Sequence, residues 1–444
     1  MNRYHGAELD VAKYVEALGP IDPVRINGKV TQVIGLTVES EGPDAKLGDV
    51  CLIYPAKGAA PVQAEVVGFR NNKVILMPLG ELQAVGPGCD VAGTGKPLRV
   101  KAGHELLGKV LDGLGLPLDG SLLPLRMQEM PTNNMPISPL QRPRVLTPLS
   151  VGVRCIDGLL TVGKGQRVGI FAGSGVGKST LLGMIARNTS ADVNVIGLIG
   201  ERGREVRDFI ERDLGPEGLA RSVVVVATSD QPALIRMKGA LITTAIAEYF
   251  RDRGLNVMMM MDSVTRYAMA LREVGLAVGE PPATRGYTPS VFASLPKLLE
   301  RAGTGPKGSI TAFYTVLVDG DDMNEPIADA VRGILDGHIV LDRRLASRGH
   351  FPAIDVLSSV SRVMSEIVPK EHIAASTRMK RLLATYREAE DLINIGAYKQ
   401  GSNPEIDQSL EYIQAIKQFT TQATDEKSEL GQTQQLLIGQ FAGG

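Results

Sequence analysis

Five short runs of apolar residues lie between residues 167 and 318, and each is bounded by glycine or polar turn residues. The runs are RVGIF, NVIGLIG, SVVVVAT, NVMMMMD and ITAFYTVLV. Stretches with helical periodicity separate them, such as PALIRMKGALITTAIAEYFRDRG at 232–254. Strands that are apolar throughout are buried on both faces, and intervening helices provide the crossovers of a parallel sheet. We therefore predict an α/β core with a mainly parallel sheet.

The pattern of residues differs on both sides of this core. Residues 21–98 contain short β-branched runs and a hairpin-like RNNK, which predict a small β-barrel. Residues 99–365 are predicted to hold a linker, including GKVLDGLGLPLDG and a proline-rich stretch, followed by the core. Residues 366–444 predict a C-terminal helical domain through STRMKRLLATYREAEDLINIGAY and SLEYIQAIKQF. Residues 1–20 predict a short amphipathic helix, which is either a packed terminus or an arm that docks a partner.

The composition excludes several classes of protein. The formal net charge is -1, so there is no overall electrostatic attraction to nucleic acid. No apolar stretch reaches the roughly 18 residues of a spanning helix. Cys51, Cys89 and Cys155 are odd in number and widely spaced, which fits neither a disulfide framework nor a metal site. We therefore expect reduced thiols and a cytoplasmic location.

A glycine-rich segment, AGSGVGKS at residues 172–179, follows the RVGIF run and precedes the helical STLLGMIA. A strand, such a loop and a helix in this order form a phosphate-binding loop, although Ala172 replaces the first glycine of the general pattern. Lys178 is expected to reach the β- and γ-phosphates, and Ser179 to bind Mg²⁺. The predicted nucleotide-binding residues are Ala172, Gly173, Ser174, Gly175, Val176, Gly177, Lys178, Ser179 and Thr180.

Two carboxylates follow predicted strands and are candidates for the chemistry. Asp262 ends the NVMMMMD run, where an aspartate can hold the Mg²⁺ shell. Many strands end in aspartate, so this assignment depends on the phosphate loop that precedes it. Glu201 directly follows NVIGLIG, where it could polarise a water in line with the γ-phosphate. From spacing alone, Glu201 fits a solvated charge run at a helix start equally well.

Long segments of the sequence resemble the flagellar protein-export ATPases. They include LLTVGKGQRVGIFAGSGVGKSTLLGMIAR, VIGLIGERGREVRDFI and GSITAFYTVLVDGDDMNEPIADAVRGILDGHIVLDRRLASRGHFPAID. More broadly they resemble the ATPases of type III secretion and the catalytic subunit of rotary ATP synthases. The resemblance covers nearly the whole chain. It implies a RecA-like phosphate-loop core, ATP and Mg²⁺ as ligands, and ATP hydrolysis coupled to protein export.

The resemblance also implies roles for residues near the phosphate loop. Glu201, in a GER motif, matches the catalytic carboxylate that orients the attacking water. Arg202 and Arg266 match positions that contact the terminal phosphate. Glu205 matches a residue that supports the Mg²⁺ site.

Two further roles follow from the resemblance and concern residues late in the core. Phe351 matches a position where an aromatic ring packs on adenine, and the alternative is an ordinary core phenylalanine. Arg362 matches an arginine finger that a neighbouring subunit supplies, and the alternative is a local ion pair. With a finger supplied in trans, an isolated subunit is expected to be a poor ATPase.

The resemblance implies partners as well. It implies a homohexamer held by the β-barrel, a central-stalk protein and a peripheral-stalk-like negative regulator at the N-terminal arm. It also implies contacts with export-gate membrane proteins, export chaperones and flagellar substrates, and no nucleic acid. The expected location is cytoplasmic, peripherally associated with the membrane-embedded export apparatus.

Three rival functions remain to be weighed. The catalytic subunit of a proton-driven ATP synthase would share Lys178, Glu201 and Arg362, although no acidic stalk-contact loop of the synthase kind is found. A ring helicase on RNA is disfavoured because the N-terminal module lacks interleaved aromatic and basic residues. A nucleotide-holding subunit without turnover should lack the catalytic carboxylate, and it is disfavoured because Glu201 is present. Service to another type III secretion system stays open beside the flagellar assignment.

Overall fold

The computed structural model describes residues 26–55, 59–318, 320 and 322–442. The helix predicted for residues 1–20 lies outside these residues. The chain divides into two compact units, Met1–Leu98 and Arg99–Gly444. Each unit is described by itself below.

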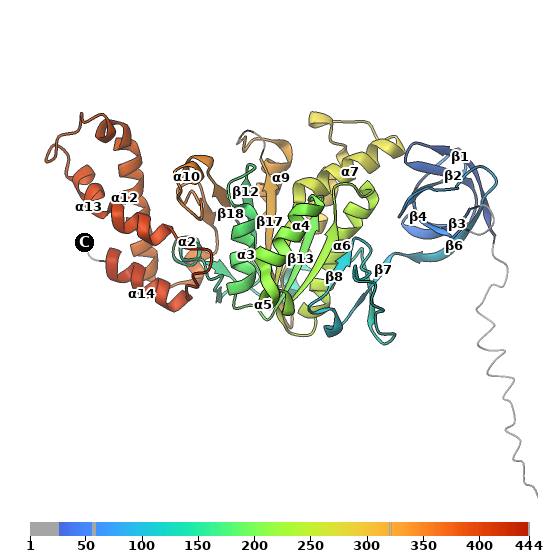
Figure 1. Ribbon diagram of the computed structural model, residues 1–444, viewed down its shortest axis with the longest axis horizontal. Helices are drawn as coiled ribbons and strands as arrows, with labels where there is room; N and C mark the ends of the chain where they lie inside the picture. The colour runs from blue at the N-terminus through green and yellow to red at the C-terminus, as the bar shows by residue number, and fades with distance from the viewer. Residues whose placement is uncertain (1–25, 56–58, 319, 321, 443–444) are drawn as a thin grey trace, which may run out of the picture. The chain divides into compact units, whose positions relative to one another are not determined.

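The first unit is a closed six-stranded barrel (Figure 1), with neighbours in the order β1-β2-β5-β4-β3-β6. Its strands are β1 (Gly28–Ile34), β2 (Thr37–Glu41), β3 (Asp49–Tyr54), β4 (Val62–Arg70), β5 (Lys73–Pro78) and β6 (Asp90–Pro97). Asn71 and Asn72 form the turn between β4 and β5 with φ of 47° and 62°. Positive φ at both central residues suits the twist of a two-residue hairpin, and asparagine tolerates it. The barrel and the RNNK hairpin are confirmed.

The centre of the second unit is a largely parallel sheet, with neighbours in the order β19-β18-β12-β17-β15-β13-β14-β8. All five predicted runs form strands in it, which confirms the α/β core. The parallel strands are β8 (Val110–Asp112), β12 (Arg167–Ala172), β13 (Val193–Ile199), β14 (Ser222–Ala227), β15 (Asn256–Asp262), β17 (Ser309–Leu317) and β18 (Gly337–Leu341). Two short strands, β16 (Gly303–Thr304) and β19 (Val360–Ser361), pair antiparallel with β17 and β18.

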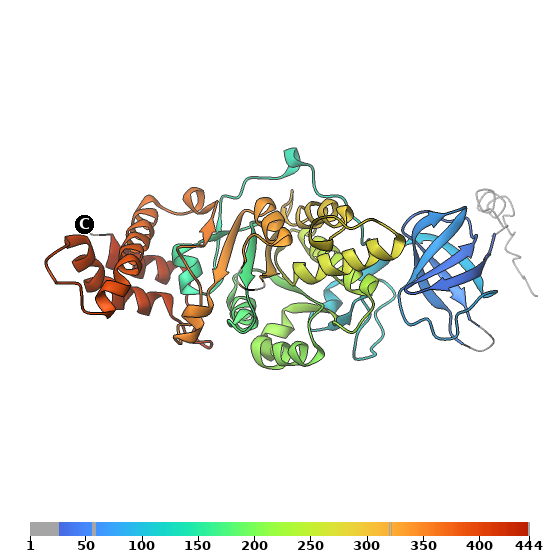
Figure 2. The same ribbon diagram turned by 90° about the horizontal axis from the view of Figure 1, so that it is seen from above.

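Helices cover both faces of this sheet (Figures 1 and 2). Ile196 and Leu198 of β13 share an apolar cluster with Leu181 of α3. Between them, Gly197 faces Thr243 of α6 so closely that a Cβ would lie 2.6 Å from its hydroxyl. The helices of the core are α2 (Arg154–Leu159), α3 (Lys178–Asn188), α4 (Gly203–Asp208), the π-helix η3 (Phe209–Leu214), α5 (Gly215–Ala220), α6 (Ala233–Arg251), α7 (Val264–Val278), α8 (Pro289–Leu299), α9 (Pro326–Ile334), α10 (Arg343–Ser347) and α11 (Met364–Ile367), with short 3-10 turns η1 (His104–Leu106), η2 (Pro139–Gln141) and η4 (Thr284–Gly286).

Part of the predicted linker belongs to the sheet. Strand β8, within GKVLDGLGLPLDG, pairs with Val224–Val226 of β14. Strand β7 (Arg99–Ala102) pairs with β9 (Gln128–Pro131), and β10 (Pro148–Leu149) pairs with β11 (Val162–Gly163). Strands of two to four residues are too short to show a periodicity, and pairing with a distant partner defines them.

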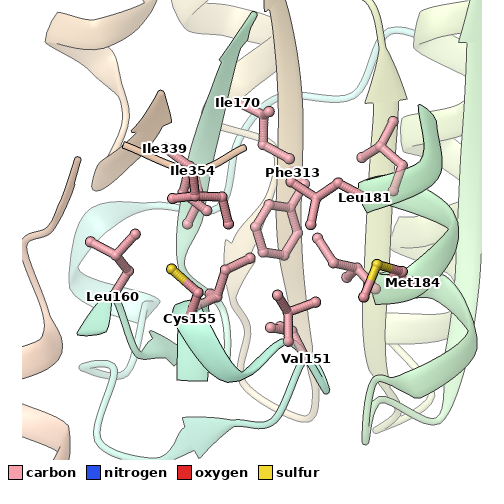
Figure 3. Packing of buried hydrophobic residues seen from close by; sticks show 14 of the residues in the cluster. Val151, Cys155, Leu160, Ile170, Leu181, Met184, Phe313, Ile339 and Ile354 are labelled. Carbon is pink, nitrogen blue, oxygen red and sulfur yellow. The ribbon is translucent and has the colours of Figure 1, made fainter. Parts of the chain in front are cut away.

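The C-terminal helices share a core with the sheet. They are α12 (Lys370–Asn394), α13 (Pro404–Thr420) and α14 (Leu430–Phe441), and Phe419 and Phe441 join the apolar cluster of the core. Figure 3 shows Phe313 of β17 among Leu181 and Met184 of α3 and Cys155 of α2. Within the described ranges, no helix is long and apolar enough to cross a membrane.

Candidate active site

The phosphate loop connects β12 to α3. Gly175 and Gly177 have φ of 78° and 87°, a region that side chains other than glycine rarely adopt. Val176 between them is buried and anchors the loop, whereas Ser174 at its tip is exposed. Helix α3 begins at Lys178, so its first free N–H groups point toward the loop. The backbone is therefore arranged to surround an anion.

The order of the strands brings the candidate side chains to one edge of the sheet. Strands β12, β17, β15 and β13 are parallel neighbours, so their carboxyl ends lie at the same edge. The phosphate loop follows β12, Asp262 ends β15, and Glu201 lies two residues beyond β13. Residues that are far apart in sequence therefore meet beside the loop.

Lys178 contacts both candidate carboxylates. Its Nζ lies 2.6 Å from Oδ1 of Asp262 and 3.3 Å from Oε1 of Glu201. The Thr315 hydroxyl donates to the same oxygen of Asp262 at 2.7 Å. Burial opposes the charge on Lys178, but the two carboxylates outweigh it and hold the lysine pKa above its usual value. The three charges form one buried cluster.

Burial lowers the pKa of a lysine but raises the pKa of a carboxyl group. It raises the pKa of Asp262, which is 3% exposed, against the lowering effect of Lys178. Burial also raises the pKa of Glu201, where Lys178 again opposes the shift and the Glu205 carboxyl adds to it. A raised pKa makes a carboxylate a better proton acceptor, which suits a general base.

A cavity of about 660 Å³ opens above this cluster. Its lining includes Arg202, Arg266 and Glu205 from the predicted set. The Nε of Arg266 is buried and has no hydrogen-bond partner among the residues that the structure describes. Arg202 is exposed and lies 3.6 Å from Glu205 in a weak ion pair. The cavity therefore carries an excess of positive charge, which suits a polyphosphate.

Sequence reasoning missed five residues of this cavity: Gly200, Arg212, Ser229, Leu317 and Val318. Gly200 has φ of 74°, and a Cβ there would lie 2.7 Å from the Cβ of Arg266. The glycine that ends NVIGLIG was the signal for such a close approach. Arg212 lies in a π-helix and Ser229 follows β14, and neither stands in a recognisable motif.

The cavity and the adjoining strand edge offer oxygen donors to Mg²⁺. Ser179, in the first turn of α3, lines the cavity, and Asp262 lies at the same strand edge. Hydroxyl and carboxylate oxygens with bound water and phosphate are the ligands that Mg²⁺ prefers. Among the described residues, no group of three His, Cys, Asp or Glu side chains is placed to hold a metal. The arrangement fits an ion that shares its shell with a nucleotide and does not fit an all-protein metal site.

Phe351 lies next to the phosphate loop. A Cβ built on Gly177 would lie 3.6 Å from two atoms of the Phe351 ring. The Phe351 side chain is 45% exposed, so it is not an ordinary core phenylalanine. An exposed ring beside the loop offers a face on which a base can stack.

Arg362 is placed differently from the other predicted residues. It follows β19 at the edge of the sheet, is exposed, and is absent from the lining of the cavity. Its Nη2 lies 3.5 Å from the carbonyl oxygen of Arg332, and it forms no ion pair with any residue that the structure describes. Among the described residues the local ion pair considered above is therefore absent, and Arg362 does not line the cavity of its own chain.

Three family models match the chain. The ATP synthase alpha/beta family beta-barrel domain matches residues 30–95, and the nucleotide-binding domain of the same family matches residues 152–361. The T3SS EscN ATPase C-terminal domain matches residues 368–438.

Comparisons over the whole chain agree with these family matches. The chain is 61% identical over 418 residues to a flagellum-specific ATP synthase of Bacillus subtilis, covering 94% of this chain and 95% of the relative. It is similar to the assembled ATPase EscN of the enteropathogenic E. coli type III secretion system, with a TM-score of 0.87, 48% identity, and coverage of 93% and 99%. EscN in complex with its central stalk EscO matches with a TM-score of 0.86, 47% identity and the same coverage.

Proposed function

The chain belongs to the family of flagellum-specific ATP synthases and type 3 secretion system ATPases, and from this premise we propose that it hydrolyses MgATP to drive export of flagellar proteins. The observation that carries the catalytic part is the meeting of Lys178, Asp262 and Glu201 within 3.3 Å beside a phosphate loop.

The residues have separate tasks in this proposal. The loop amides and Lys178 bind the β- and γ-phosphates, and an incoming polyphosphate competes with both carboxylates for the lysine ammonium. Ser179 and Asp262 hold Mg²⁺, with Glu205 supporting that site. The ion, when bound, neutralises charge on the phosphate oxygens.

Glu201 performs the proton transfer. It lies at the rim of the cavity with a raised pKa, so it can orient a water and accept its proton. Arg202 and Arg266 stabilise negative charge on the terminal phosphate, since both line the cavity. Phe351 stacks on the adenine.

Arg362 completes the site of a neighbouring subunit. We propose a homohexamer in which this guanidinium reaches the adjacent nucleotide, because it is exposed and does not line its own cavity. An arginine supplied in trans contributes about 10³- to 10⁵-fold to turnover. A central-stalk protein is a proposed partner, as EscO is for EscN.

The remaining proposed partners are export-gate membrane proteins, export chaperones with their flagellar substrates, and a negative regulator at residues 1–20. With these partners, the proposed location is the cytoplasm beside the membrane-embedded export apparatus. A second candidate function is service to another type III secretion system, which the 48% identity to EscN supports. The match of the C-terminal residues to the EscN model favours either export role over an ATP synthase.

The test is ATP turnover per subunit as a function of protein concentration, with particle mass followed by light scattering. We expect turnover to rise as rings assemble, and to be Mg²⁺-dependent. Glu201→Gln serves as the control for background hydrolysis, since it should form the same particles. Equal turnover in dilute monomers and in assembled material would contradict the proposal.

A further inference from the structure

The connection between α13 and α14 is tied to the ATPase core. At the start of α2, the Arg154 guanidinium donates to the carbonyl of Thr421 at 2.6 Å and pairs with Glu426 at 2.5 Å. Arg187, in the last turn of α3, donates to the carbonyl of Thr424 at 2.7 Å. This connection is therefore held by the same helix that begins at the phosphate loop.

Gln422 lies at the centre of the connection and is 6% exposed. Its Oε1 accepts from the backbone N–H of Arg154 at 2.7 Å. Its Nε2 donates to the carbonyl oxygens of Gly152 and Glu426 at 2.9 and 2.8 Å. Because both amide hydrogens and the amide oxygen are used, the side chain has one orientation in which all its partners are satisfied.

The backbone of Gln422 extends this network to the nucleotide site. Its N–H donates to the carbonyl oxygen of Phe351 at 2.9 Å. The ring of Phe351 lies beside Gly177 of the phosphate loop. A single backbone hydrogen bond therefore links Gln422, whose side-chain amide is buried, to Phe351, whose ring offers a face on which a base can stack.

We propose that Gln422 is a positioning residue for the nucleotide base: through its hydrogen bond to Phe351, it fixes the ring at the distance from the phosphate loop that the base requires. The inference rests on the proposed function, since it assumes that ATP binds in this loop. It goes beyond that function by assigning affinity for the base, as distinct from the phosphates, to the C-terminal helical region.

The effect should be confined to the base. Without its amide, three backbone groups lose their partners, and such groups move toward water or toward other partners. The Gln422 N–H then leaves the Phe351 carbonyl, and the ring loses its support. Lys178, Asp262 and Glu201 are held at the sheet edge and do not contact this network.

The test compares two ligands that share phosphates and differ in the base. Isothermal calorimetry on the full chain, with Mg²⁺, measures Kd for ATP and for inorganic tripolyphosphate in the wild type and in Gln422→Met. We expect Kd for ATP to rise about tenfold, the size of a lost stacking contact, and Kd for tripolyphosphate to stay unchanged. Turnover at saturating ATP should stay within about twofold. Equal weakening of both ligands, or no change for either, would overturn the inference.

Two further variants separate positioning from general damage. Arg187→Met removes another tether of the same connection without touching Phe351, and it should leave both Kd values unchanged. In a Phe351→Ala background, Gln422→Met should add no further loss, and additive losses would count against the inference. Where Gln422→Met does not fold, Gln422→Glu keeps the acceptor for Arg154 and loses both donors, and the same readouts apply. A wild type that neither binds tripolyphosphate nor hydrolyses ATP contradicts the proposed function instead.

Discussion

The two ends of the candidate site are built in different ways. At the phosphate end, Asp262 is buried at the end of β15 and pairs with the half-buried Lys178. At the base end Phe351 is 45% exposed, and at the sheet edge Arg362 is exposed without an ion-pair partner among the described residues. The difference is the one that the proposed function requires: one chain should complete the phosphate end alone, and the exposed residues should act on a ligand or on a second copy.

The largest effect that tests this contrast is expected at Arg362. Arg362→Ala should lower turnover of assembled protein by about 10³-fold or more, since the transition-state charge loses a cation. Binding of ATP should change little because Arg362 does not line its own cavity. Steady-state turnover and Kd measured together check both parts, with the exposed Arg381→Ala on α12 as a matched control.

A mixture tells whether Arg362 acts between subunits. Lys178→Ala loses tight ATP binding but keeps Arg362, so mixing it with Arg362→Ala should restore part of the turnover. Rings that remain intact by light scattering yet show no restored activity would place Arg362 outside the neighbouring site.

The next effect concerns Glu201, at the phosphate end. Glu201→Gln should bind MgATP and assemble normally but turn over at least about a hundredfold more slowly, because an amide accepts no proton. Single-turnover hydrolysis measures the chemical step directly. Glu211→Gln, which removes an exposed carboxylate paired with Arg207, is the control. Normal hydrolysis by Glu201→Gln would mean that another carboxylate is the base.

A smaller effect is expected at Gly200. In Gly200→Ala the new Cβ would lie 2.7 Å from that of Arg266, so the arginine must shift away from the cavity. We expect kcat to fall about tenfold, the equivalent of one weakened hydrogen bond to a charged group. Gly203→Ala is the control, since a Cβ there meets nothing within 4 Å. Equal activities would show that Arg266 is not held in place by its neighbour.

A last test concerns the support of the base end, and it is read out as stability, with no effect expected on turnover. Asp157 accepts from the N–H groups of Val151 and Gly152 and from the hydroxyl of Ser150, and Gly152 in turn accepts from Gln422. Burial nevertheless raises the pKa of Asp157 to about 7. Its pKa in the unfolded chain is about 3.9.

Between about pH 4 and pH 7 the folded protein therefore keeps a proton that the unfolded chain has released. This contribution to the free energy of unfolding falls as pH rises, by at most about 1.4 kcal/mol per pH unit. Denaturant unfolding at several pH values should show this slope in the wild type and lose it in Asp157→Asn. Free energies of unfolding that change with pH in the same way in both proteins would contradict this prediction.

Much of the fold could be predicted because its signals are local. Each buried strand of the core is a continuous apolar run, and the residue that follows such a strand must lie at the sheet edge. Asp262 was found in this way and Lys178 from the phosphate-loop pattern, and the structure brings them to 2.6 Å. From spacing alone the role of Glu201 was undecided, since a charge run after a strand is also typical of a solvated helix start.

What the sequence did not reveal depends on distant partners. The three residues of β8 acquire their strand character only beside β14. Strand β18 alternates between buried and partly buried residues among charged neighbours, so it lacks a continuous run. Gln422 stands in an unremarkable polar stretch, and its importance depends on Gly152, Arg154 and Phe351, which are brought near it only by folding.

The ammonium between the two carboxylates has a consequence for how the protein is made. Two acids buried side by side without a cation would repel each other and would favour an open chain until a ligand arrived. Since Lys178 comes from the same polypeptide, a newly synthesised molecule can close its interior around neutralised charge before it meets any nucleotide. We therefore expect the subunit to fold without bound nucleotide.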